Sequence, residues 1–190
     1  MRNIAIFASG SGTNAENIIK HFSNNENAQV RLVLSNKRHA MVLKRAEALN
    51  VDTCFFEYDD FYRSGRVLDR LESYNTDFIV LAGFLWLVPE NILDRYPRRI
   101  VNIHPALLPL YGGKGMYGDA VHKAVIAGGA KESGITIHYV NKHYDSGDIL
   151  FQAHCSVEPG DTPETLASRI HALEYMHYPR VIEDLVKDLA

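Results

Sequence analysis

The sequence predicts an α/β protein with a doubly wound, mostly parallel sheet, helices on both faces and a mixed C-terminal edge. Three observations carry this prediction. Short apolar runs rich in β-branched residues alternate with segments of helical periodicity through the first half of the chain. Glycine or proline stands at several of the points where these runs meet. In the second half, two strand-like runs follow each other with only a turn between them.

In the first half, continuous apolar runs predict strands, and apolar residues at helical spacing predict the helices between them. We expect strands at 4–8, 30–34, 51–58 and 78–84, and helices after the glycines at 10–12, around 41–49 and over 62–74. The run 78–84 (FIVLAGF) is the most apolar and should lie at the sheet centre. Pro89 suits the N1 position of a short helix.

The second half departs from this alternation. A strand at 100–103 leads into a long glycine-containing loop, from Pro105 to about Gly118, of the kind that often acts as a functional lid. A helix at 120–127, strands at 135–140 and 149–157, and a last helix starting at Thr162-Pro163 follow. We expect the last helix to bend or break near Pro179. With no repeat or linker, residues 1–190 are predicted to form a single domain.

Composition excludes several functional classes. The 190 residues include 20 Lys plus Arg and 23 Asp plus Glu, a net charge of -3 that predicts no nucleic-acid partner. Two cysteines cannot supply a disulfide framework or a site of three or four thiolates. No apolar run could span a bilayer, and residues 1–9 lack the features of a signal peptide. We therefore expect a cytoplasmic protein that does not bind membranes.

A glycine loop, Gly10-Ser11-Gly12-Thr13-Asn14, separates the first predicted strand from the first helix. Backbone N–H groups at such a helix N-terminus bind anions, so we expect phosphate here, with a simple tight turn as the alternative. The segment 35–38 (SNKR), after the second strand, lacks the acidic residue that NAD binding requires. NADP stays possible, since Lys37 and Arg38 could hold a 2′-phosphate.

Asn102 and His104 should point to one face of a strand, because they are two residues apart. An amide and an imidazole aimed at one point can stabilise a developing oxyanion. Asp145 lies in a turn at the same predicted edge and could orient the imidazole, favour its charged form or relay protons. Purely structural roles are the alternative, because turns favour aspartate and strand ends accommodate histidine. His122 and His138 are further candidates, but no histidines have zinc-site spacing.

In this order the motifs resemble the phosphoribosylglycinamide formyltransferases over essentially the whole chain. The matching motifs are the glycine loop, Leu81-Ala82-Gly83-Phe84, Asn102-Ile103-His104-Pro105, Leu107-Leu108-Pro109, His138, Asp145, and Glu174 with Tyr178-Pro179. The resemblance implies a Rossmann-like formyltransferase fold. It also implies transfer of a formyl group from 10-formyltetrahydrofolate to the amine of glycinamide ribonucleotide, in purine biosynthesis and without a metal.

The resemblance further implies roles for individual residues. Asn102, His104 and Asp145 would form the catalytic trio. The ribonucleotide would bind Gly10, Ser11, Gly12, Thr13, Asn14 and Glu174. The folate would bind Leu85, Trp86, Leu87, Asn102, Val140 and Arg63, although Arg66 could replace Arg63. Trp86 stands where many relatives have arginine, and the loop 110–119 (LYGGKGMYGD) departs from the common form, which leaves the role of Lys114 open. The protein could be a monomer or a homodimer.

Four other functions are alternatives to this transferase. Formyl transfer to tRNA would need a basic face and a further domain. A formyltetrahydrofolate hydrolase usually has an extra domain before the glycine loop. An NADP-dependent oxidoreductase would leave Asn102, His104 and Asp145 without a shared role, and a non-catalytic binding module would bind nucleotide without turnover. The transferase is the preferred prediction.

Overall fold

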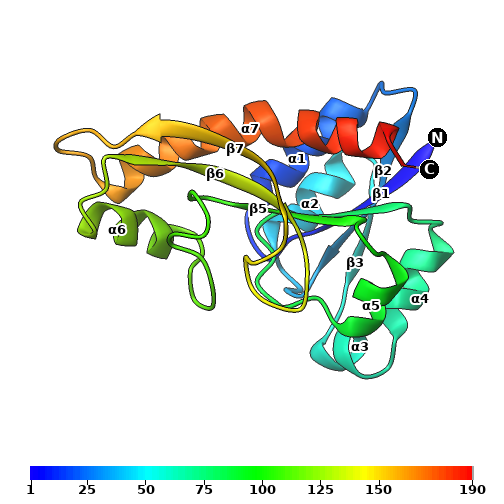
Figure 1. The fold of residues 1–190 in the computed structure, drawn as a ribbon. Coiled ribbons are helices and arrows are strands. Elements are labelled where there is room, and N and C mark those ends of the chain that lie inside the picture. The colour runs from blue at the N-terminus through cyan, green and yellow to red at the C-terminus, as the bar shows by residue number, and fades with distance from the viewer. Residues whose placement is uncertain (190) are drawn as a thin grey trace.

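The computed structural model describes residues 1–189, which contain a seven-stranded sheet (Figure 1). Its strands are β1 (Arg2–Phe7), β2 (Ala28–Ser35), β3 (Asp52–Phe55), β4 (Phe78–Leu81), β5 (Ile100–His104), β6 (Glu132–Tyr139) and β7 (Ile149–Ser156). The order is β3-β2-β1-β4-β5-β6-β7, and the first five strands pair in parallel. β6 is antiparallel to both β5 and β7. The predicted fold class is confirmed, and the apolar strand β4 lies at the centre.

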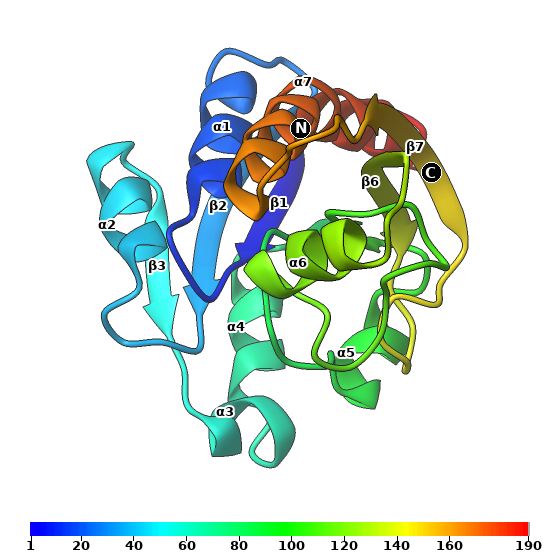
Figure 2. The same cartoon turned by 90° about the vertical axis from the view of Figure 1, so that its left-hand side faces the viewer.

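Helices cover both faces of this sheet (Figure 2). One face is covered by α1 (Thr13–Phe22), α2 (Met41–Ala48), α6 (Asp119–Ala127) and α7 (Pro163–Lys187). The other is covered by the shorter helices α3 (Tyr58–Tyr62), α4 (Arg66–Ser73) and α5 (Glu90–Arg95). Side chains of β1 alternate between the two cores: Ile4 and Ile6 enter the first, and Ala5 and Phe7 the second. We name these the α1/α7 core and the α3/α5 core.

The region from β3 to α5 differs from the prediction in its boundaries. β3 ends at Phe55 instead of Tyr58, because the next helix, α3, starts within the expected strand. Glu57 is the N-cap residue of α3 and forms a capping box, in which its N–H donates to the Asp60 carboxylate at 3.0 Å. The helix expected over 62–74 corresponds to α4 and begins later, at Arg66, because Gly65, whose φ of 75° is left-handed, is its N-cap residue; α3 ends at Tyr62. Pro89 is the N-cap residue of α5 instead of N1.

Helix α7 continues unbroken through Pro179, so the expected break is wrong. A proline has no N–H, which leaves the Tyr175 carbonyl, four residues earlier, without its helical donor. Asn17 of α1 supplies the missing donor, with Nδ2 3.0 Å from the Tyr175 oxygen. On the buried side, the Tyr178 hydroxyl donates to the Leu81 carbonyl at 2.8 Å. Tertiary contacts thus support the helix on both sides of the proline.

Candidate active site

A cavity of about 520 Å³ is lined by the segments that follow the carboxyl ends of β1, β4 and β5, where doubly wound sheets bind ligands. Its volume lies within the usual range for small-molecule sites, about 300–1,000 Å³. The lining comprises residues 10–14, 82–85, 102–105, 113–118, 144–145, His122, His171 and Glu174.

Most of the predicted site residues meet in this cavity. The trio Asn102, His104 and Asp145 lines it, together with the whole glycine loop, Glu174 and Leu85. The other predicted folate residues, Trp86, Leu87, Val140 and Arg63, are not among the lining residues. Their assignment to the folate stays a prediction, as does the choice between Arg63 and Arg66, which pair with Asp59 and Asp60 on or beside α3.

Asp145 is the centre of the polar cluster, and its side chain is only 11% exposed. Its Oδ2 lies 3.5 Å from His104 Nδ1 and accepts from the Gly113 N–H at 3.0 Å. Its Oδ1 accepts from Asn102 Nδ2 at 3.4 Å and lies 3.6 Å from His138 Nε2. The antiparallel pairing of β5 with β6 places Asn102 opposite His138, which explains why these side chains meet.

Backbone carbonyls determine which histidine nitrogens carry protons. His104 Nε2 lies 2.8 Å from the Tyr111 oxygen, and because a carbonyl only accepts, this nitrogen is the donor. Nδ1 of His104 is therefore the atom that faces Asp145. In the same way, His138 Nδ1 donates to the Tyr139 oxygen at 2.8 Å, and its Nε2 faces the Asn102 amide at 3.2 Å.

Burial and neighbouring charges shift the pKa values of His104 and Asp145. Burial lowers the pKa of His104 below its ordinary value of 6.5, and the Asp145 carboxylate and the Tyr111 carbonyl only partly oppose this. Asp145 thus favours the charged form of His104 while burial opposes it more strongly, and the role of this pair in catalysis stays a prediction. Burial alone would raise the pKa of Asp145, but His138, His104 and the Gly113 N–H together lower it. Asp145 is the stable anion of the cluster.

Backbone groups of the loop that follows β5 complete the cluster, and sequence reasoning missed them because backbone contacts leave no side-chain pattern. Tyr111 and Asp145 both have left-handed φ angles, 55° and 49°. A Cβ on Gly112 would lie 2.5 Å from Leu108 Cδ2 and 3.3 Å from Asp145 Cβ, so a larger residue there would require these side chains to shift. His171 was also missed as a cavity residue, although its i, i+3 spacing from Glu174 is a usable signal.

The glycine loop forms the other part of the cavity lining. Gly12 has a φ of 78°, and a Cβ there would lie 2.4 Å from the Val42 side chain, so this position requires glycine. No side chain caps the N-terminus of α1, which leaves its first N–H groups available to an anion. Asn14 Nδ2 donates to Glu174 Oε2 at 2.9 Å. Burial raises the pKa of Glu174, while Asn14 and His171 oppose the shift.

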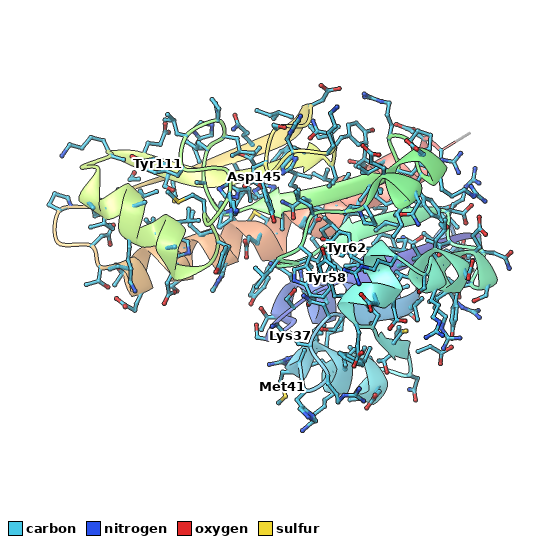
Figure 3. All side chains as sticks on the ribbon, turned by 90° about the horizontal axis from the view of Figure 1, so that it is seen from below. Lys37, Met41, Tyr58, Tyr62, Tyr111 and Asp145 are labelled. Atoms are coloured by element: carbon cyan, nitrogen blue, oxygen red, sulfur yellow. The ribbon has the colours of Figure 1, made fainter. Side chains whose placement is uncertain are left out.

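Lys37 and Arg38, the residues that could serve an NADP site, do not line the cavity. Lys37 lies well apart from Asp145 in Figure 3, and the Arg38 guanidinium lies over the Phe55 ring at 4.3 Å. The structure therefore brings the trio together with the glycine loop but without these two basic residues.

Comparison with known proteins agrees with this geometry. The sequence model of the family described as formyl transferase matches residues 2–182. The chain belongs to the formyl transferase family. A Bacillus subtilis protein named phosphoribosylglycinamide formyltransferase is 37% identical over 191 residues, 98% of this chain and 95% of its own. The crystal structure of a phosphoribosylglycinamide formyltransferase from Bacillus halodurans has a TM-score of 0.88 and 37% identity, covering 98% of this chain and 96% of that one.

Two plant relatives are longer than this formyl transferase. The protein named phosphoribosylglycinamide formyltransferase, chloroplastic, from Arabidopsis thaliana is 41% identical over 187 residues, which are 95% of this chain but 64% of the relative. The match to the protein of the same name from Vigna unguiculata covers 62% of that protein. The chain thus spans less than two thirds of these two relatives.

The described part of the formyl transferase contains neither a membrane-spanning helix nor a cluster of metal ligands. Across residues 1–189, no helix has both the length and the apolar character needed to cross a membrane. Over the same range, no group of three or more His, Cys, Asp and Glu side chains is arranged to hold a metal ion.

Proposed function

We propose that this protein transfers the formyl group of 10-formyltetrahydrofolate to the amine of glycinamide ribonucleotide. The products are N-formylglycinamide ribonucleotide and tetrahydrofolate, in de novo purine biosynthesis. The observation that carries the proposal is the meeting of Asn102, His104 and Asp145 in one cavity with the glycine loop and Glu174. The names of the two Bacillus relatives support it.

The glycine loop and Glu174 suit the ribonucleotide. The phosphate would accept hydrogen bonds from the first N–H groups of α1, with Gly12, Thr13 and Asn14 around it. Glu174 would bind the amine-bearing part of the ribonucleotide, and Asn14 holds this carboxyl in place at 2.9 Å. Both groups line the same cavity as the trio, as a two-substrate reaction requires.

The remaining lining suits a flat, largely apolar formyl donor. Phe84, Leu85 and Tyr144 add apolar and aromatic surface beside the trio. When bound, 10-formyltetrahydrofolate supplies the activated formyl carbon. Trp86, Leu87, Val140 and Arg63 would contact parts of the donor that extend beyond the cavity.

The reaction forms one bond from the formyl carbon to the substrate amine and breaks the bond from that carbon to the donor nitrogen. One proton passes from the amine to that nitrogen. Asn102 Nδ2, which donates to Asp145 at 3.4 Å, would turn to the formyl oxygen as negative charge develops there. A donor in this role typically contributes about 100-fold or more to the rate.

Asp145 and His104 would move the proton. Asp145 is anionic because its partners lower its pKa, so it can accept the amine proton directly or through water. His104 Nδ1, 3.5 Å away, would receive the proton next. Because burial lowers its pKa, a protonated His104 gives the proton up readily to the departing nitrogen. Such acid–base help is typically worth about 100- to 10,000-fold.

Further proposals concern the whole protein: residues 1–190 act as one domain, in the cytoplasm, as a monomer or a homodimer. The single seven-stranded sheet supports the proposal of one domain.

The test follows the absorbance of a 10-formylfolate with and without glycinamide ribonucleotide. We expect formyl loss that requires the ribonucleotide. Asp145→Asn and His104→Ala should each lower kcat by about 100-fold or more, while ribonucleotide binding stays largely intact. The exposed His143→Ala is the matched control and should keep wild-type kcat. Formyl loss without ribonucleotide would instead identify a hydrolase, and full activity in both site variants would refute the proposed roles.

A further inference from the structure

The charges that line the cavity are unbalanced for a phosphorylated substrate. Among the described residues that line it, Lys114 is the single lysine or arginine, whereas Asp145 and Glu174 are carboxyl groups. A ribonucleotide phosphate brings about two negative charges at neutral pH. Placing it among carboxylates is unfavourable unless a cation compensates, and burial disfavours charge on His104 and on His122.

We propose that the ammonium group of Lys114 binds the substrate phosphate together with the N-terminus of α1, and so selects a phosphorylated substrate over its nucleoside. This inference rests on the proposed function and adds a specificity-determining residue to it. The glycine loop supplies neutral N–H donors to the phosphate, and Lys114 supplies the positive charge.

Lys114 is free to take this role. Its side chain is exposed, and within residues 1–189 no ion pair involves it, whereas Lys20 and Lys187 both pair with glutamates one helical turn away. Its neighbours Gly113 and Gly115 have left-handed φ angles of 99° and 90°. A Cβ on either would meet no atom within 4 Å, so there is open space around the backbone that carries the lysine.

The base of this turn is held against the trio. Met116 N–H donates to the Gly113 oxygen at 3.0 Å, closing the turn that contains Lys114. The Gly113 N–H donates to Asp145 at 3.0 Å, and the Tyr111 oxygen accepts from His104 at 2.8 Å. The lysine therefore extends from a segment whose position is set by the reacting centre, while the side chain itself stays unpaired within the described residues.

The packing of the loop places Lys114 on the ribonucleotide side. Tyr111 and Met116 pack against the α1/α7 core, which includes the residues of α1, α6 and α7 around the glycine loop and Glu174. Trp86 and Val140, predicted for the folate, pack against the α3/α5 core on the opposite face of the sheet. The phosphate is thus a better partner for Lys114 than the carboxylates of the folate.

The experiment compares steady-state kinetics with glycinamide ribonucleotide and with its dephosphorylated nucleoside. Lys114→Ala should raise the KM for the ribonucleotide about tenfold or more, the usual effect of losing a charge-assisted hydrogen bond. It should leave the KM for the formyl donor and the kcat/KM for the nucleoside unchanged. Lys114→Arg should restore most of the affinity, and the exposed Lys123→Ala on α6 is the matched control, expected to behave as wild type.

Two results would overturn the inference: an equal loss with nucleotide and nucleoside, or a KM increase confined to the formyl donor. Calorimetry with ribose 5-phosphate separates this failure from failure of the proposed function. Wild-type protein should bind it more tightly than Lys114→Ala, whatever reaction follows. Lys114-dependent binding without formyl transfer would refute only the proposed reaction. Formyl transfer with unchanged ribose 5-phosphate binding in Lys114→Ala would refute only the lysine's role.

Discussion

His104 shows how burial can outweigh an adjacent opposite charge. Its side chain is 3% exposed, and the nearest carboxylate oxygen of Asp145 lies 3.5 Å from Nδ1. The free energy needed to remove an imidazolium from water exceeds the stabilisation that the Asp145 carboxylate provides, so burial lowers the pKa of His104. Asp145 resists the same burial because several donors face its two oxygens. The number of partners, and not proximity alone, sets the direction of each pKa shift.

We predict that NMR titration of the His104 ring gives a pKa below 6.5, and that Asp145→Asn lowers this pKa further. The carboxylate favours the protonated imidazole, so its removal leaves burial unopposed. His177 is the internal control: burial also lowers its pKa, but Asp145 is not among the causes, so the substitution should leave it unchanged. An increase in the His104 pKa in the variant would contradict the assigned causes.

Helix α7 shows that a helix can accommodate proline when a neighbouring helix replaces the lost hydrogen bond. Pro179 leaves the Tyr175 carbonyl without an N–H donor, and Asn17 of α1 donates to it at 3.0 Å. Because α7 continues past this position, it reaches from Glu174, in the cavity, to the contact of Lys187 with Glu183. Continuity of the helix therefore links the site to the chain end.

We predict an interaction between Asn17 and Pro179 in a double-mutant cycle measured by urea unfolding. Asn17→Ala should lose a hydrogen bond worth about 0.5–1.5 kcal/mol. In a Pro179→Ala background this loss should shrink, because alanine restores the N–H that bonds Tyr175. The helix propensity gained at position 17 cancels in the cycle. Independent, additive effects of the two substitutions would show that Asn17 does not compensate for the proline.

At the scale of the molecule, polar contacts join α7 and the chain ends to the sheet. The buried Tyr178 hydroxyl donates to the Leu81 carbonyl at 2.8 Å, and Arg2 Nη2 donates to the Leu189 oxygen at 2.5 Å. Arg2 of β1 and Leu189, which follows α7, therefore lie side by side. Glu174 adds a buried carboxyl between α7 and α1, where its charge opposes folding but suits ligand binding.

We predict that Glu174→Gln raises the melting temperature at neutral pH while weakening ribonucleotide binding. The folded-state pKa of Glu174 is raised above 4.5, so the folded protein binds more protons than the unfolded chain, and stability falls as pH rises through this window. The stability of Glu174→Gln should not fall over this pH window. Below the window, wild type and variant should be equally stable. Glu183→Gln is the control of opposite sign: its pKa is lowered to about 2, so the substitution should destabilise at neutral pH. A less stable Glu174→Gln at pH 7 would contradict the prediction.

The sequence by itself determined the features that depend on local periodicity. The apolar run of β4 indicated the sheet centre, and two-residue spacing put Asn102 and His104 on one face. The glycine loop was predictable because Gly10 and Gly12 stand directly between a strand-like run and a helical one. Each of these signals is formed by residues that are close together in the sequence, so the sequence alone is enough to recognise it.

Only the tertiary structure decided the contacts and charges that join distant segments. Asp145 reaches His104 because β6 pairs antiparallel with β5, and the Tyr111 and Gly113 contacts use backbone atoms that any residue has. The lowered pKa of His104 follows from burial, and the continuity of α7 follows from Asn17, over 150 residues away in the chain. The physical reason is that desolvation and hydrogen-bond pairing depend on everything packed around a group, which local sequence patterns do not encode.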